Sequence, residues 1–281
     1  MTQTEKAALF RKLHRSPPIL VLPNAWDAAS ARIMEDAGAP AIATTSAGIA
    51  LSLGYPDGQR ISRQEMLAAV RRIAAAVEVP VTADIEAGYG EGPEAVAETV
   101  RGVLEAGAVG INLEDSWERD GVRTWADAGL QQDRIRAACE VARAAGIPLL
   151  VNARTDVFLH AFGEESARFD EAVRRLNAYL GAGGDCTFPV GVRERTVVAA
   201  LVRAVKGPVN ILAGPGAPAI PELAELGVAR VSFGAGFLRA ALGVARRILT
   251  ELRGAGTYAG FPEDTLTSAE SGRLFARGSR G

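Results

Sequence analysis

The chain of 281 residues is 48% hydrophobic and 23% charged, which is typical of a folded globular protein and excludes a largely disordered one. Its 31 basic and 33 acidic residues leave a formal net charge of −2, so the overall charge offers no attraction for nucleic acid or an anionic membrane. We therefore expect a small-molecule partner, with no nucleic acid and no membrane.

Two cysteines, Cys139 and Cys186, limit the redox and metal chemistry of the chain. Neither has another Cys or a His at metal-ligand spacing, which argues against a zinc site and a disulfide framework. Both are expected to be small buried apolar residues. The first residues lack the apolar core of a signal peptide, and no apolar run reaches the roughly 18 residues of a membrane helix. A cytoplasmic location is expected.

Short apolar runs alternate with amphipathic stretches along most of the chain. Residues 4–14 predict a helix that covers one end of the fold. The apolar runs predict eight strands, at 19–25, 41–48, 79–86, 108–114, 148–154, 185–190, 208–213 and 228–233. Helices are predicted between them at 27–37, 62–77, 94–106, 131–145, 169–182, 193–205 and 218–226, and most end in a turn that contains glycine.

Eight successive strand and helix units predict an α/β fold, a single (β/α)8 TIM barrel, for residues 1–253. A doubly wound open sheet is the alternative. It is less favoured because Asn24-Ala25-Trp26-Asp27 follows the first strand, where a dinucleotide-binding fold carries a glycine-rich turn. Residues 254–281 predict a C-terminal arm, extended at 257–262 and helical at 268–277. This arm would be loosely held in a monomer and would pack on a partner subunit in an oligomer.

Acidic residues follow several of the predicted strands, at the end where a TIM barrel has its active site. Asp84 and Glu86 share one face of the third strand, and Glu114 ends the fourth. Alone, an Asp-x-Glu pair could cap a helix or face solvent. Gathered at one end of a barrel, the three carboxylates favour a site for Mg²⁺, with Mn²⁺ as an alternative, because these cations prefer oxygen ligands.

A cation at this position predicts chemistry on a 2-oxo acid. It would chelate the carboxylate and keto oxygens, while Arg154 and the turn from Ser46 to Gly48 donate hydrogen bonds. This arrangement stabilises an enolate, so cleavage of a C–C or C–P bond beside the keto group, or decarboxylation, would benefit. Asn210, at the end of the seventh strand, and Trp26, after the first, are further candidates for contact with substrate.

Six segments, in chain order, resemble the isocitrate lyase and phosphoenolpyruvate mutase superfamily. The resemblance implies an α/β barrel that binds Mg²⁺ and a small 2-oxo acid or its enolate. It also implies a homodimer or homotetramer in which the last helix swaps onto a neighbouring barrel. The segments are Asn24-Ala25-Trp26-Asp27, Thr45-Ser46-Ala47-Gly48, Gly54-Tyr55-Pro56-Asp57, Ala83-Asp84-Ile85-Glu86-Ala87-Gly88-Tyr89-Gly90, Glu114-Asp115 and Asn152-Ala153-Arg154-Thr155-Asp156.

Carried over residue by residue, the resemblance implies that Asp84 ligates the metal directly, with Glu86 and Glu114 acting largely through waters. Asp57 would lie beside the reacting group. We therefore assign catalytic roles to Asp57, Glu114 and Arg154. The substrate-binding set is Trp26, Ser46, Ala47, Gly48, Asp84, Arg154 and Asn210.

The chain departs from the superfamily pattern at three places. Glu86 stands where the family usually has Asp. Residues 116–125 contain neither Cys nor His, whereas lyases of the superfamily carry a Lys-Lys-Cys-Gly-His motif in this mobile loop, with the Cys as acid-base residue. Val190 stands near the position where such lyases usually have a Glu, whose carboxylate helps them to recognise a tricarboxylic substrate. These departures favour a smaller substrate, such as oxaloacetate or phosphonopyruvate.

Two functional alternatives stay open. One is a barrel that binds a 2-oxo acid with little or no turnover, because it lacks the loop cysteine. The other is phosphate chemistry at the glycine-rich turns 214–216 and 234–236, which lie where many barrels bind phosphate but lack a clear Lys or Arg pattern.

The aromatic and histidine residues outside the motifs carry weaker signals. Trp117 and Trp125 either close over a bound substrate or anchor the loop on the barrel. His14 is expected at the surface. His160 follows the fifth strand, and a structural or exposed role is favoured over a catalytic one.

Overall fold

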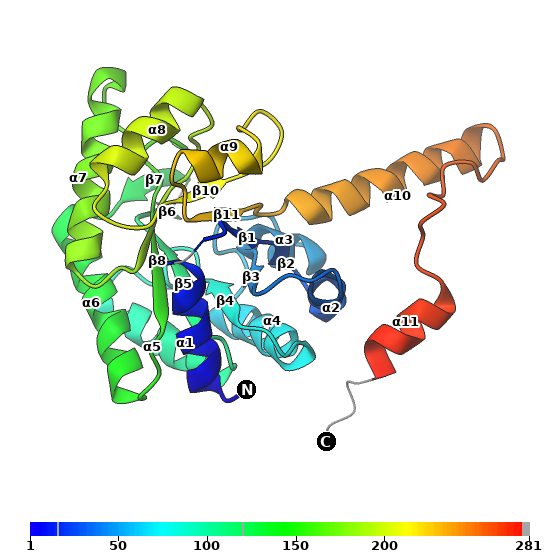
Figure 1. Ribbon diagram of the computed structural model, residues 1–281, viewed down its shortest axis with the longest axis horizontal. Coiled ribbons are helices and arrows are strands. Elements are labelled where there is room, and N and C mark those ends of the chain that lie inside the picture. The colour runs from blue at the N-terminus through cyan, green and yellow to red at the C-terminus, as the bar shows by residue number, and fades with distance from the viewer. Residues whose placement is uncertain (16, 120, 277–281) are drawn as a thin grey trace.

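Figure 1 shows the computed structural model, which describes residues 1–15, 17–119 and 121–276. The strands are β1 (Leu20–Leu22), β2 (Asn24–Ala25), β3 (Ile42–Thr44), β4 (Val81–Asp84), β5 (Gly110–Glu114), β6 (Ser116–Arg119), β7 (Val122–Trp125), β8 (Leu150–Thr155), β9 (Cys186–Pro189), β10 (Asn210–Leu212) and β11 (Arg230–Ser232). The helices are α1 (Gln3–Leu13), α2 (Ala28–Asp36), α3 (Ser46–Ser52), α4 (Arg63–Ala76), α5 (Pro93–Glu105), α6 (Ala128–Ala144), the 3₁₀ turn η1 (Glu165–Ala167), α7 (Arg168–Gly181), α8 (Arg195–Ala204), α9 (Ile220–Glu225), α10 (Gly236–Gly254) and α11 (Ser268–Phe275).

The parallel strands close into the predicted (β/α)8 barrel. One sheet has the order β2-β3-β4-β5-β8-β9 and another the order β1-β11-β10. β1 and β2 are two parts of the first barrel strand, separated by Pro23, so this strand pairs with β11 through β1 and with β3 through β2. A bridge between Thr187 and Val209 joins the other two edges.

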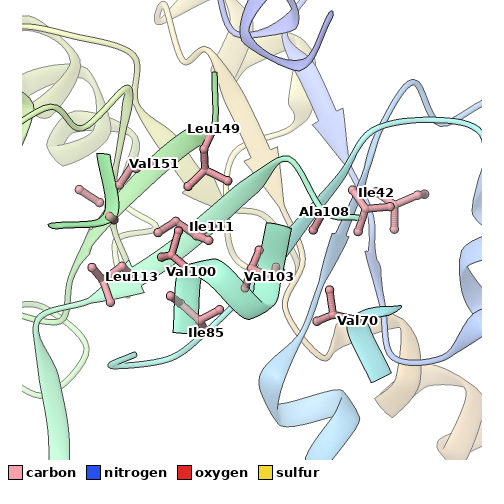
Figure 2. Packing of buried hydrophobic residues seen from close by; sticks show 14 of the residues in the cluster. Ile42, Val70, Ile85, Val100, Val103, Ala108, Ile111, Leu113, Leu149 and Val151 are labelled. Carbon is pink, nitrogen blue, oxygen red and sulfur yellow. The ribbon is translucent and has the colours of Figure 1, made fainter. Parts of the chain in front are cut away.

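On β5, alternation separates an apolar outer face from polar residues that point into the barrel. On β5, Ile111 and Leu113 belong to the main apolar cluster with Val100 and Val103 of α5, as Figure 2 shows. Each such burial contributes about 1.5–3 kcal/mol relative to exposure. The alternate residues of β5 therefore point inward, and they include Asn112 and Glu114.

The amino-terminal helix α1 closes the end of the barrel opposite the carboxyl ends of the strands. Thr2 caps the helix, and the fully buried Phe10 packs with apolar residues of the barrel floor such as Leu150. His14 is only 5% exposed, its Nδ1 lies 2.8 Å from the Phe10 carbonyl oxygen, and its ring meets the Phe10 ring edge-on. The prediction that His14 lies at the surface is wrong, because α1 turns this side chain onto the barrel floor.

Two predicted boundaries also differ from the structure. The second barrel strand ends at Thr44, and α3 begins at Ser46, where the Thr45 hydroxyl accepts the Gly48 N–H at 3.3 Å. The predicted loop from 115 to 132 contains an antiparallel hairpin of β6 and β7, and Ser116 pairs with Trp125 at its base.

The carboxyl-terminal segment leaves the barrel. Figure 1 shows α10 projecting away from it, and Leu238 is the one described residue of this helix that is buried. α11 lies against α2 of the same chain, where Arg32 donates to the Leu274 carbonyl. The exchange of this segment with a neighbouring subunit, and the division of the chain at residue 253, stay predictions. Among the residues that the structure describes, no helix has the length and apolar character needed to cross a membrane.

Candidate active site

A cavity of about 230 Å³ opens at the carboxyl ends of the barrel strands. Five of the predicted site residues line it: Ser46, Ala47, Asp57, Asp84 and Arg154. The cavity is small, and its walls carry both carboxylates and guanidinium groups. These features suit a short anionic ligand together with a cation.

Asp84 is held in one orientation at the end of β4. Its Oδ2 accepts hydrogen bonds from the backbone N–H and the hydroxyl of Ser46, at 3.0 and 2.8 Å. Its Oδ1 accepts from the side-chain amide of Asn112 at 2.9 Å, and its own N–H donates to the Thr44 hydroxyl at 2.9 Å. Both carboxylate oxygens are therefore held by protein donors.

Glu86 lies in a constrained turn just beyond β4. Its φ is +50°, a left-handed conformation that costs a residue with a side chain on the order of 1 kcal/mol. Gln59 stabilises the turn, because its N–H donates to Glu86 Oε2 at 2.5 Å and its side-chain oxygen accepts from the Tyr89 N–H at 2.9 Å. The buried guanidinium of Arg134 donates to the Ala87 carbonyl from the other side.

The acids around Asp84 repel one another. Burial raises the pKa of Glu86 to about 8, with further contributions from the charges of Asp84 and Asp57. Burial also raises the pKa of Asp57, and the charge of Asp84 adds to the shift. Asp57 lies at the cavity mouth with part of its surface exposed. A cation among these groups would relieve the repulsion.

The donor set fits Mg²⁺ with a single direct protein ligand. The described residues contain no group of three or more His, Cys, Asp or Glu side chains arranged to hold a metal ion by themselves. Mg²⁺ keeps several of its waters and takes one or two carboxylates, so Asp84 as ligand with Glu86 and Glu114 at the water shell matches its preferences.

Glu114 and Arg154 form an ion pair across adjacent strands. Arg154 Nη1 lies 2.7 Å from Glu114 Oε2, and Arg154 Nε lies 2.6 Å from Asp156 Oδ1. Burial alone would lower the pKa of Arg154, but the charges of Asp156 and Glu114 outweigh burial and raise it. Burial raises the pKa of Glu114, and the Arg154 charge opposes that rise. Arg154 therefore stays charged in the cavity wall.

A buried network beneath Arg154 fixes its position. Asp156 Oδ2 accepts the Ser116 hydroxyl at 2.5 Å, and its N–H donates to Asp115 Oδ1 at 3.0 Å. Asp115 Oδ2 also accepts from Thr155 at 2.7 Å and from Arg175 at 3.1 Å. The network thus connects the guanidinium to the base of the hairpin.

The two loop tryptophans anchor the hairpin on the barrel in this structure. Trp117 is 9% exposed, packs with Ala87, and has the Arg134 guanidinium 5.4 Å from its ring centroid. Trp125 packs on Phe162 with ring centroids 4.8 Å apart. His160 lies beside Trp125, with ring centroids 6.4 Å apart.

Other residues predicted at the site lie outside the cavity lining. Trp26 lines a separate apolar groove between α2 and α10. Gly48 lies in the first turn of α3, where an added Cβ would lie 2.5 Å from Thr45 Cγ2. Asn210 is buried in the barrel and donates to the Ser232 hydroxyl at 3.0 Å. Glu86 and Glu114 lie behind the lining, in contact with the groups described above.

Several site residues were missed from the sequence. Asn112 could have been found, since it shares a strand face with Glu114. No local sequence pattern marked four others, which are Gln59, Arg134, Arg230 and Arg239. Near the glycine-rich turns, Arg193 donates to the Pro215 carbonyl at 3.0 Å, and Arg239 lines the cavity with Gly234. The fold therefore brings two arginines close to turns that lack a clear Lys or Arg pattern in the sequence.

The fold and the acid-lined site define a TIM-barrel enzyme of the lyase and mutase type. The sequence profile of the phosphoenolpyruvate phosphomutase family matches residues 10–253, and the chain belongs to this family. It is thus an enzyme of the isocitrate lyase and phosphoenolpyruvate mutase superfamily, as the sequence motifs predicted.

Three comparisons place the chain among its relatives. A crystal structure from Burkholderia cenocepacia J2315, provisionally assigned as a lyase/mutase, is 40% identical with a TM-score of 0.90 and covers 98% of this chain and 96% of its own. The 2-methylisocitrate lyase of Bacillus subtilis (strain 168) is 33% identical over 191 residues, 67% of this chain and 60% of the relative. Oxaloacetate acetylhydrolase in complex with its product oxalate is 28% identical with a TM-score of 0.84, over 98% of this chain and 94% of its own.

Proposed function

We propose that the protein is a Mg²⁺-dependent enzyme that acts on a small 2-oxo acid by cleaving or decarboxylating an oxaloacetate-like substrate. C–P chemistry on a phosphonopyruvate-like substrate is the second candidate. The observation that carries the proposal is the small cavity in which the fixed carboxylate of Asp84 and the charged Arg154 line one space. The likeness to oxaloacetate acetylhydrolase supports an oxaloacetate-like substrate.

Asp84, Glu86 and Glu114 would hold the cation. A bound Mg²⁺ would supply positive charge to the keto oxygen, where negative charge collects when the bond beside the keto carbon breaks. Ser46 keeps Asp84 turned toward the cavity, and Arg154 keeps Glu114 in place. These protein contacts orient the two carboxylates, which would reduce the reorganisation that the reaction needs.

Arg154 and the Ser46–Ala47 turn would bind the substrate carboxylate, with the guanidinium providing charge and planar donors. Asp57 lies at the cavity mouth, and its raised pKa suits a group that exchanges a proton with the reacting carbon. Val190 lines the same cavity as an apolar residue. The cavity therefore lacks the carboxylate that similar lyases are expected to use to recognise a tricarboxylic acid, which supports a smaller substrate.

We also propose that the enzyme is a homodimer or homotetramer in which the C-terminal segment contributes to the interface. Large apolar residues of α10 are exposed in the single chain, including Phe237, Leu242 and Leu249. Association would remove this surface from water. Light scattering of the purified protein coupled to size exclusion tests the assembly, and a monomer at micromolar concentration would contradict it.

The reaction is tested by incubating the purified enzyme with Mg²⁺ and oxaloacetate, phosphonopyruvate, isocitrate or 2-methylisocitrate, and following products by NMR. We expect turnover of oxaloacetate that stops with EDTA and returns with added Mg²⁺. Turnover of phosphonopyruvate alone would favour the second candidate. Saturable binding without any turnover would instead support the binding barrel considered from the sequence.

A further inference from the structure

Arg230 is a buried cation at the floor of the cavity. It lies on β11 and is 2% exposed, yet it is among the residues that line the cavity. Its Nε and Nη1 have no hydrogen-bond partner among the described residues, and none of the carboxylates described lies within ion-pair distance of the guanidinium. Such a group is rare, because burying a charge is costly unless it is paired.

The groups near Arg230 cannot neutralise it. Burial lowers the pKa of His14 to about 3, which leaves that ring neutral, and raises the pKa of the Cys186 thiol to about 12. Burial lowers the pKa of Arg230 to about 10, so the guanidinium is still charged at neutral pH. The charge of Asp84 opposes this lowering of the pKa of Arg230, but no ion pair joins the two side chains among the described residues.

Thr82 and Ser232 line the same cavity as Arg230 and add hydrogen-bonding capacity without charge. Asn210 and Ser232 lie on β10 and β11, with the Asn210 amide donating to the Ser232 hydroxyl. Asn210 Oδ1 and Thr82 Oγ1 are buried without partners among the described residues. A hydroxyl such as that of Thr82 can donate to an anion. Arg230 therefore lies beside this space with two N–H groups that have no partner among the described residues.

We infer that Arg230 forms an anion-binding subsite at the cavity floor that accepts a carboxylate group. This inference rests on the proposed function for its main ligand, which is the second carboxylate of a dicarboxylic 2-oxo acid. A small free carboxylate such as formate has the same chemistry and would bind there in its absence. The subsite would therefore select dicarboxylic over monocarboxylic 2-oxo acids.

The first experiment measures the thermal midpoint of the metal-free enzyme in low-salt buffer while formate is added. Without metal, the acids at the cavity mouth disfavour binding of an anion there. A rise of the thermal midpoint with formate therefore reports on binding at the cavity floor. We expect formate to stabilise the parent, as a ligand of the folded state does, and to have little effect on Arg230→Met. Arg230→Lys keeps the charge and should retain part of the response.

Arg134→Met is the matched control for the loss of a buried arginine. Arg134 is also buried with its pKa lowered to about 10, but it has acceptors in Gln131 and the Ala87 carbonyl. Without formate, Arg134→Met should lower the midpoint because it leaves these acceptors unpaired. Arg230→Met should keep or raise it, because an apolar side chain replaces an unpaired charge. A fall equal to that of Arg134→Met would overturn the inference in favour of a purely structural arginine.

The second experiment compares ligands by calorimetry in the presence of Mg²⁺, using pyruvate and the dicarboxylate 3,3-difluorooxaloacetate. Arg230→Met should weaken the affinity for the dicarboxylate about 10- to 100-fold, which is the loss expected for one charge-assisted hydrogen bond. The affinity for pyruvate should change less than about twofold. Equal effects on both ligands, or no effect on either, would show that Arg230 does not recognise the second carboxylate.

The experiments can reject the Arg230 subsite and the proposed function independently of each other. An Arg230-dependent formate response in an enzyme that turns over no 2-oxo acid would leave the subsite standing and reject the proposed function. Turnover of oxaloacetate with formate and dicarboxylate binding unaffected by Arg230→Met would reject the subsite and leave the function standing.

Discussion

Ser46 donates both its backbone N–H and its hydroxyl to the same oxygen of Asp84, at 3.0 and 2.8 Å. The first barrel helix after β3 therefore begins at a residue that orients the proposed metal ligand. Ser46 and Asp84 are 38 residues apart in sequence, and the parallel pairing of β3 with β4 brings them together.

Asp84→Asn should lower kcat/KM at least 100-fold, because an amide retains the shape of the group but loses its charge. Ser46→Ala removes one of the two donors and should cost about tenfold. Steady-state kinetics and Mg²⁺ calorimetry provide the measurements. Ser52→Ala is the control, since its hydroxyl donates to the Ile49 carbonyl within the same helix. An Asp84→Asn enzyme that binds Mg²⁺ as tightly as the parent would show that this ligand is misassigned.

Stability should fall in mild acid because of His14. Its pKa is about 3 in the folded protein and about 6.5 when unfolded, so only the unfolded state gains the proton as the pH falls below 6.5. The stability that depends on neutral His14 is thus fully present above pH 6.5 and is lost progressively as the pH falls toward 3. Urea unfolding should show that, from pH 7 to pH 5, the free energy of unfolding falls by about 2 kcal/mol more in the parent than in His14→Gln. His160→Gln changes a more exposed ring whose pKa burial also lowers, so it should differ from the parent less than His14→Gln does. Equal losses in the parent and both variants would refute the assignment.

Arg154→Met should destabilise the fold as well as abolish activity. The substitution leaves the buried Glu114 and Asp156 carboxylates without their cation, which costs about 3 kcal/mol or more. Adding Glu114→Gln should recover part of this loss. Urea unfolding of the two single variants and the double variant gives the coupling energy. Simple additivity would mean that the pair contributes nothing to stability.

Gly110→Ala should destabilise the floor of the barrel by about 1–3 kcal/mol. An added Cβ would lie 2.7 Å from Thr82 Oγ1 and 2.8 Å from Phe10 Cε1. Gly181→Ala is the control, because nothing lies within 4 Å of its added Cβ at the end of α7. Thermal unfolding of both variants is the measurement. A neutral Gly110→Ala would show that α1 does not press against the barrel here.

The barrel was predictable because each strand is a short buried run with an amphipathic helix after it. Asp84 and Arg154 were predictable because strand ends meet at one end of a barrel. Arg230 was not, since an arginine within a strand usually marks an exposed edge, and its burial depends on how eight strands close. His14 was misjudged because its burial depends on the angle at which α1 crosses the barrel floor. The hairpin of β6 and β7 was missed because its strands lack alternating apolar residues.

Gln59 ties together two acids that are far apart in the sequence. Its backbone and side chain are both bonded to the turn that carries Glu86, and it lies two residues from Asp57. Displacement of the Asp57 segment would therefore break two hydrogen bonds to this turn. The positions of Asp57 and Glu86 are thus mechanically coupled through one glutamine.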